Sequence, residues 1–178
     1  MHYQDIIDKY YPAASPLRDI YMRHCRQVAD EALDIARRHA LPLHDADIEA
    51  AAMLHDIGIF MTDAPGIHCH GDSPYIMHGI LGASLLRREG VDEPIAAVAE
   101  RHTGAGITAA DITALNLPMP PGDYMPRTLL ERLVCYADKF YSKSGDMQRK
   151  CLERVRASMA RHSADTLTRF EALHREFA

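Results

Sequence analysis

Cysteine is scarce in this sequence, and long apolar runs are missing. Its four cysteines, Cys25, Cys69, Cys135 and Cys151, are widely spaced and form no C-x-x-C pair, so neither a disulfide framework nor a cysteine-based zinc finger is expected. No apolar run approaches the roughly 20 residues that span a bilayer, and residues 1–11 lack the apolar core of a signal peptide. We therefore expect a protein of the reducing cytoplasm, without a membrane partner.

An excess of basic charge is also missing. The chain has 20 Lys and Arg against 25 Asp and Glu, a net charge of −5, and no Lys/Arg-rich run. Because nucleic-acid-binding surfaces are strongly basic, no nucleic-acid partner is expected. With 178 residues, 47% of them hydrophobic, the chain is long enough to bury the core of one globular domain.

Apolar residues recur at three- and four-residue steps along nearly the whole chain, a pattern typical of amphipathic helices. Ser15-Pro16 and Ser73-Pro74 predict helix starts, and glycines at 58, 90 and 104 predict helix ends. We expect an all-α, single-domain bundle of six to eight helices. Residues 1–15 would form an N-terminal segment, residues 16–145 the helical domain, and residues 146–178 one amphipathic helix that packs on the same domain or at a homodimer interface. No period-two pattern predicts a strand, and residues 59–74 read as a loop.

Histidine is abundant, with eleven residues. Five predicted helices each carry one residue of a metal-ligating type in their apolar stripe, namely His24, His55, His78, His102 and Asp138, and Asp56 directly follows His55. A buried polar side chain is costly unless it is hydrogen-bonded or bound to metal. One inward histidine is more often a satisfied core residue than a ligand, but five helices that each direct one to the core indicate a common centre.

Imidazole and carboxylate ligands suit divalent iron, manganese, zinc, cobalt or nickel. Six ligands are too many for one catalytic ion with an open position, and they suffice for two ions that share a carboxylate. We expect two ions, with iron as the first choice. The expected assignment puts His24, His55 and Asp138 on one ion, His78 and His102 on the other, and Asp56 between them as the bridging, catalytic carboxylate.

The order and local strings of these residues resemble the HD-domain superfamily, and within it the HDIG-type, binuclear branch. The strings are Leu54-His55-Asp56-Ile57-Gly58, Met77-His78-Gly79 with Gly82-Ala83, Arg101-His102-Thr103-Gly104 and Ala137-Asp138-Lys139. The resemblance runs from about residue 21 to residue 143. It implies an HD-type helical fold and a metal-dependent phosphohydrolase. Such an enzyme would hydrolyse a phosphate ester or anhydride, frequently of a nucleotide, with a hydroxide that bridges the two metals.

A basic residue that often follows the His-Asp pair in these hydrolases is absent, because Gly58, Ile59, Phe60 and Met61 stand there. Another cation would have to contact phosphate. The candidates are Arg101, which is our first choice because a guanidinium matches phosphate geometry, Lys139 and Lys143. Each could instead be an ordinary surface residue.

The missing base leaves a second enzyme class open. A small branch of binuclear HD proteins with the same ligands uses a mixed-valent iron pair and oxygen to cleave a C–P or C–C bond.

His68 and His70, in the segment after the His-Asp pair, are candidates for a lid over the site; an exposed polar loop is the alternative.

Overall fold

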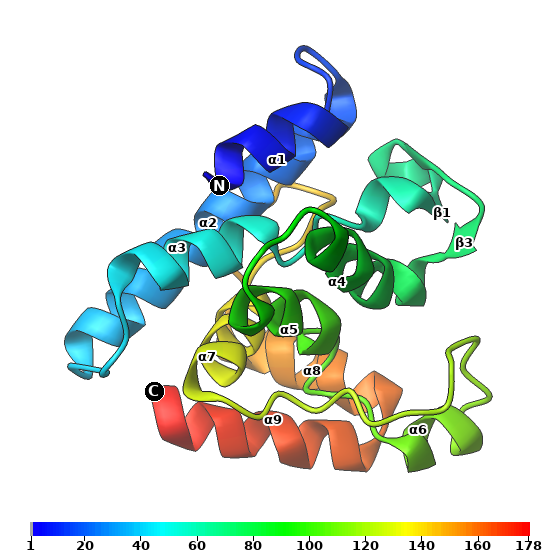
Figure 1. Ribbon diagram of the computed structural model, residues 1–178. Coiled ribbons are helices and arrows are strands. Elements are labelled where there is room, and N and C mark those ends of the chain that lie inside the picture. The colour runs from blue at the N-terminus through cyan, green and yellow to red at the C-terminus, as the bar shows by residue number, and fades with distance from the viewer. Residues whose placement is uncertain (1) are drawn as a thin grey trace.

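The computed structural model describes residues 2–178, and α-helices dominate it (Figure 1). Within this part of the chain there are nine α-helices: α1 (Tyr3–Tyr10), α2 (Pro16–Arg38), α3 (Asp45–Leu54), α4 (His78–Arg88), α5 (Glu93–Arg101), α6 (Ala109–Ala114), α7 (Leu129–Asp138), α8 (Leu152–His162) and α9 (Ala164–Phe177). The all-α fold class is confirmed. The helices number nine rather than six to eight, because the N-terminal segment is itself helical and the C-terminal stretch holds two helices.

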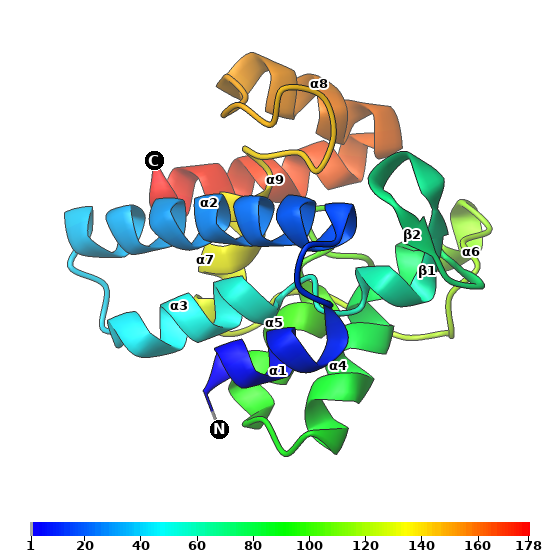
Figure 2. The ribbon, with the colours of Figure 1, turned by 90° about the horizontal axis from the view of Figure 1, so that it is seen from above.

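Helix α2 is the longest and runs through the middle of the molecule. Ser15 caps it by accepting a hydrogen bond from the backbone of Arg18, and Pro16 occupies the first turn, where its missing N–H costs nothing. In Figure 2, α8 and α9 lie on the side of α2 opposite to α1 and α3. Its buried face includes His24 and Cys25, so the central helix carries one predicted ligand into the core.

Two glycines bring the turn after α3 against the start of α4. A Cβ on Gly58 would lie 2.2 Å from the carbonyl oxygen of His78 and 2.5 Å from the amide nitrogen of Gly82. No larger residue fits at that distance, so Gly58 permits the backbone contact that sets His55 and Asp56 beside His78.

Residues 59–77, expected to be a loop up to residue 74, contain a small sheet among three 3-10 turns. The turns are η1 (Ile59–Met61), η2 (Pro65–Ile67) and η3 (Tyr75–Met77), and the strands are β1 (Thr62–Ala64), β2 (Cys69–His70) and β3 (Ser73–Pro74). Strand β1 is central, antiparallel to β2 with Asp63 opposite His70, and parallel to β3 with Thr62 opposite Ser73. Strands of two or three residues are too short to show a period of two, so no pattern in the sequence predicted them.

The C-terminal stretch, predicted as one helix, is a helical hairpin. Ser163 adopts an extended conformation (φ −169°, ψ 164°) and its hydroxyl accepts a hydrogen bond from the Thr166 amide, so it ends α8 and caps α9. From α9, Phe170 and Phe177 pack on the ring of Tyr136 in α7, with centroids 5.9 and 5.6 Å away. No helix in residues 2–178 is long and apolar enough to cross a membrane.

Because Phe170 is fully buried, we predict that Phe170→Ala lowers the free energy of unfolding by about 3–5 kcal/mol through lost burial and a cavity. Urea denaturation followed by circular dichroism measures this. The exposed Arg175 on the same helix provides the control, and Arg175→Ala is expected to change stability by less than about 0.5 kcal/mol. Equal, small effects of the two variants would mean that α9 is not part of the cooperative core.

Candidate metal centre

The structure brings all six predicted ligands together in one buried group, called here the His/Asp cluster: His24, His55, Asp56, His78, His102 and Asp138. One set comprises His24, His55 and Asp138, and the other comprises Asp56, His78 and His102; within each set the ligand atoms lie within 4.8 Å of one another. His24 lies within α2. The other five stand at helix ends, directly after α3 and α5, at the first residue of α4 and at the last residue of α7.

Three imidazoles of the cluster are oriented by backbone carbonyl groups three residues earlier. The Nδ1–H of His55 donates to Ala52 O at 2.6 Å, that of His78 to Tyr75 O at 2.7 Å, and that of His102 to Ala99 O at 2.8 Å. Since a carbonyl oxygen only accepts, Nδ1 carries the proton and Nε2 keeps its lone pair. The Nε2 atoms point into the cluster, where those of His78 and His102 are 3.0 Å apart. This is the arrangement that metal-binding histidines use.

Asp56 lies between the two sets, and each of its carboxylate oxygens faces one pair of histidines. Oδ2 is 3.1 Å from His24 Nε2 and 3.2 Å from His55 Nε2. Oδ1 is 3.4 Å from His78 Nε2 and 3.3 Å from His102 Nε2. The side chain is fully buried, and no backbone N–H of the described residues donates to it. A carboxylate buried in this way is stabilised by positive charge nearby.

The electrostatics of the cluster also favour cations. Burial alone would raise the pKa of Asp56, but Lys143 and the histidines outweigh it and hold that pKa well below its usual value. The pKa of Asp138 is likewise well below normal, because Lys139 and His24 outweigh its burial. Burial and the neighbouring His102 lower the pKa of His78 to about 3, so its imidazole is neutral and free to bind metal. Burial would lower the pKa of His55, but Asp56 outweighs it and raises that pKa well above its usual value. Two ionised carboxylates among four imidazoles form a site for divalent metal.

Of the three cations predicted to contact substrate, only Lys143 reaches Asp56. Its Nζ is 2.6 Å from Asp56 Oδ2, and its side chain is 14% exposed. Helix α7 ends at Asp138, and the chain beyond it turns back toward the cluster. Lys139 Nζ is 2.7 Å from Asp138 Oδ2 and donates to His102 O, so it braces the ligands.

Arg101 is not brought into the cluster. Its guanidinium contacts the buried Glu131 at 3.1 Å and Glu100 at 3.4 Å. His68 and His70 are both exposed on the small sheet and its turn, outside the cluster. The structure therefore gives Arg101 a packing role between α5 and α7, and it leaves the two loop histidines at the surface.

Two further residues, Cys25 and Tyr75, lie at the cluster. The Sγ of Cys25 lies within 4.8 Å of ligand atoms of His55 and Asp56. The ring of Tyr75 stacks on His78 with centroids 4.7 Å apart. The spacing of Tyr75, three residues before His78, is a sequence signal for this contact. Cys25 gives none, because a buried cysteine is common in any helix core.

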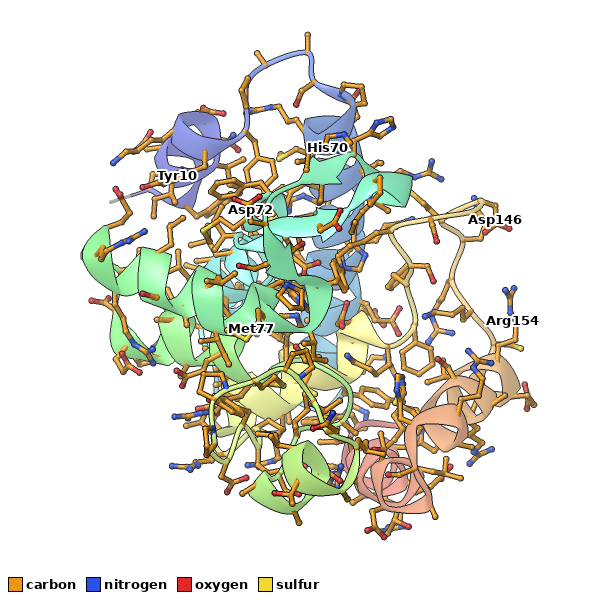
Figure 3. The ribbon with its side chains drawn as sticks, turned by 90° about the vertical axis from the view of Figure 1, so that its right-hand side faces the viewer. Tyr10, His70, Asp72, Met77, Asp146 and Arg154 are labelled. Atoms are coloured by element: carbon orange, nitrogen blue, oxygen red, sulfur yellow. The ribbon has the colours of Figure 1, made fainter. Side chains whose placement is uncertain are left out.

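Two cavities adjoin the cluster, with Tyr75 in the wall of both. The first, called the lysine cavity, has a volume of about 400 Å³ and is lined by Ala64, Gly66 and Ile67 and by Ser142, Lys143 and Ser144. Figure 3 shows the face on which the segment of His70 and Asp72 and the loop of Asp146 both lie. The second, called the apolar cavity, has a volume of about 280 Å³ and reaches His78. The apolar cavity thus meets the cluster at His78, and the lysine cavity meets it through Lys143, which contacts Asp56.

The chain belongs to the HD domain family, whose model matches residues 21–142. An uncharacterized protein of Methanocaldococcus jannaschii is 40% identical over 120 residues, which cover 66% of this chain and 63% of that protein. Two tRNA (cytidine(56)-2'-O)-methyltransferases, from Thermoplasma volcanium and Picrophilus torridus, are 33% and 32% identical over 160 residues. The alignments cover 88% and 90% of this chain but 41% and 42% of those enzymes. The chain thus spans less than two thirds of the length of these relatives.

Among solved structures, the HD domain of the L. monocytogenes phosphodiesterase PgpH matches with a TM-score of 0.56 over 96% of this chain and 94% of that one. At 13% identity, this similarity establishes the shared helical fold. It does not bear on which residues form the His/Asp cluster.

Asp56→Asn keeps the size of the side chain and removes its charge. We predict that it weakens binding of Mn²⁺ at least about 100-fold, because it removes the carboxylate that faces all four histidines, and loss of an outer-shell partner alone costs about 10- to 100-fold. Calorimetric titration measures this. A free metal concentration of about 100 times Kd should stabilise the wild type by about 2.7 kcal/mol, and Asp56→Asn should lose this gain.

The exposed Asp47 on the neighbouring helix α3 provides the matched control, and Asp47→Asn should bind Mn²⁺ as the wild type does. Wild-type affinity in a folded Asp56→Asn protein would exclude Asp56 from the metal site.

Proposed function

We propose that this protein is a metal-dependent phosphohydrolase that uses two divalent transition-metal ions, iron being the first choice, on a small phosphorylated substrate of the nucleotide class. The observation that carries the proposal is the position of Asp56. Each of its oxygens faces a separate pair of imidazoles at 3.1–3.4 Å, which is the position of a carboxylate shared by two ions.

In this proposal His24, His55 and Asp138 hold one ion, His78 and His102 hold the other, and Asp56 contributes to both. When bound, such ions supply charge neutralisation for the phosphoryl oxygens and activate water at neutral pH. Carbonyl groups of the chain fix three imidazoles through Nδ1, so the ligands need little rearrangement. The burial of the cluster excludes bulk water, which strengthens every charge interaction in it.

Lys143 is the proposed phosphate-contacting residue. Burial would lower the pKa of its ammonium group, but Asp56 and the other nearby acidic groups outweigh burial and raise it; the side chain therefore carries a fixed positive charge. It lines the lysine cavity, so an anionic group that enters from there meets this charge at the edge of the cluster. Such a cation fits phosphate and takes the place of the base missing after the His-Asp pair. It therefore favours the hydrolase over the diiron oxygenase, which was considered because no base was evident.

Of the similar proteins, PgpH supports the proposed chemistry and the tRNA methyltransferases do not identify the substrate. PgpH is a phosphodiesterase, and its fold agrees with phosphate-ester chemistry. The tRNA methyltransferases are more than twice as long as the segment that this chain matches, and the net charge of −5 disfavours RNA. Small phosphate esters are therefore the proposed substrates, and RNA serves as a comparison in the test.

The test begins with anaerobic purification and reconstitution with Fe²⁺, Mn²⁺, Zn²⁺, Co²⁺ or Ni²⁺. We expect two metal ions per chain, and release of phosphate from nucleotides with more than one of these metals. Plasma emission spectrometry and a phosphate assay measure the two quantities, with phosphonates and tRNA as comparison substrates. Oxygen consumption with a phosphonate, and no hydrolysis of any ester, would replace the hydrolase by the oxygenase.

Lys143→Met keeps the aliphatic stem and removes the charge. We expect turnover to fall about 30- to 1000-fold, equivalent to about 2–4 kcal/mol of transition-state stabilisation, with two metal ions still bound. Arg101→Ala is the comparison, and its turnover should change less than about threefold because Arg101 pairs with Glu131. If Arg101→Ala were the inactive variant and Lys143→Met the active one, the phosphate contact would belong to Arg101.

A further inference from the structure

The apolar cavity shares Tyr75 with the lysine cavity. Ile107, Leu115 and Leu117 line it, together with His78 of the cluster. Ile107 lies in the α5–α6 connection, Leu115 and Leu117 follow α6, and His78 begins α4. The cavity therefore presents aliphatic surface within reach of the proposed reaction centre.

Leu115 stands out on the surface of the molecule. With 45% of its surface exposed, it is the single large hydrophobic side chain that is exposed among residues 2–178. It lines the apolar cavity. Isolated exposed leucines are ordinary, but an exposed apolar residue that continues an apolar cavity marks a surface that a ligand can cover.

The charged residues of this cavity neutralise each other. Arg169 Nη2 is 2.7 Å from Asp111 Oδ2 and also lies within hydrogen-bond distance of Gly106 O and Thr166 Oγ1. These contacts are all made by Nη2, and the Arg169–Asp111 pair brings no net charge to the cavity. The Nε of Arg169 has no hydrogen-bond partner among the described residues, and His162, whose pKa is lowered by burial, also lines the cavity. The cavity is therefore less cationic than the lysine cavity.

Gly104 lines the cavity without adding a side chain to it. Gly104 has φ +60°, and a Cβ there would meet only Gly106 O, at 3.9 Å. The left-handed conformation favours glycine, and the missing side chain leaves the space next to Thr103 and His78 open. The remaining volume of about 280 Å³ is near the lower end of small-molecule sites, about 300 Å³, so it suits one or two fused rings rather than a long chain.

We propose that the apolar cavity binds an uncharged, flat ring group of the substrate, while the phosphate of the same molecule lies at the cluster. This inference rests on the proposed phosphohydrolase function and specifies its substrate as the phosphate ester of a ring-bearing alcohol. The ring belongs either to a nucleobase or to an aryl group. Leu115, Ile107 and Leu117 contact its faces, and Tyr75 separates it from Lys143.

Leu115→Ser tests the cavity by steady-state kinetics on matched substrates. We expect the KM for adenosine monophosphate and for 2-naphthyl phosphate to rise about fivefold, since part of an apolar contact worth about 10-fold or more is removed. The KM for glycerol phosphate, which has no ring, should stay unchanged. Ala64→Trp narrows the lysine cavity, where the phosphate is proposed to enter, and is the comparison: it should affect the KM of all three substrates alike. A rise in KM confined to the ring substrates in Ala64→Trp, and none in Leu115→Ser, would place the ring in the other cavity and overturn the proposal.

Binding of the ring alone separates this inference from the proposed reaction. Adenosine and 2-naphthol carry no phosphate, and nuclear Overhauser contacts from their ring protons to methyl groups of the wild-type protein locate them. Contacts with Leu115 and Ile107 support the inference even where no phosphate ester is hydrolysed. Tighter binding of adenosine indicates a nucleobase, and tighter binding of 2-naphthol an aryl group. Contacts with Ala64 or Ile67, or no contact at millimolar concentrations, would overturn it.

Discussion

The structure depends on the burial of one carboxylate, Asp56, in the middle of four imidazoles. It is fully buried and receives no backbone hydrogen bond within residues 2–178, so positive charge must offset much of its desolvation. Lys143 supplies part of that charge, and the chemistry of the surrounding ligands suits divalent metal for the remainder. The site is therefore an electrostatic requirement of the folded chain as well as a place for chemistry, and metal binding should contribute to folding stability.

The helical fold meets this requirement through its helix ends. The last carbonyl groups of an α-helix have no partner within the helix, and here Ala52 O in α3 and Ala99 O in α5 accept the Nδ1–H of the histidines that directly follow these helices. One hydrogen bond satisfies the helix end and also orients a ligand. This explains why the ligands gather where helices stop, and why the close backbone contact at Gly58 matters for the geometry of the cluster.

The ligand set could be predicted because it depends on local periodicity. His24 and Asp138 repeat with the apolar stripe of their own helices, and that pattern is visible along the chain without knowledge of its neighbours. The contact between Lys143 and Asp56 could not be predicted, because Lys143 reaches Asp56 only after the chain turns at the end of α7. The pairing of Arg101 could not be predicted for the same reason: its partner Glu131 lies 30 residues away on another helix. The break at Ser163 could have been read from its capping chemistry, although the charged helical pattern on both sides obscured it.

The two cavities differ because different segments of the chain line them. The ligands come from helices and their ends, and the same set would serve hydrolysis or oxygen chemistry. Lys143, Ser142 and the small sheet line the charged approach, whereas the connection through α6 lines the apolar one. Both are made largely by connecting segments, which vary more freely than a packed core. In this chain the helices position the residues of the metal centre, and the connecting segments line the cavities through which a substrate would approach it. Since one cavity presents charge and the other aliphatic surface, a substrate that satisfies both must carry an anion at one end and an uncharged apolar group at the other.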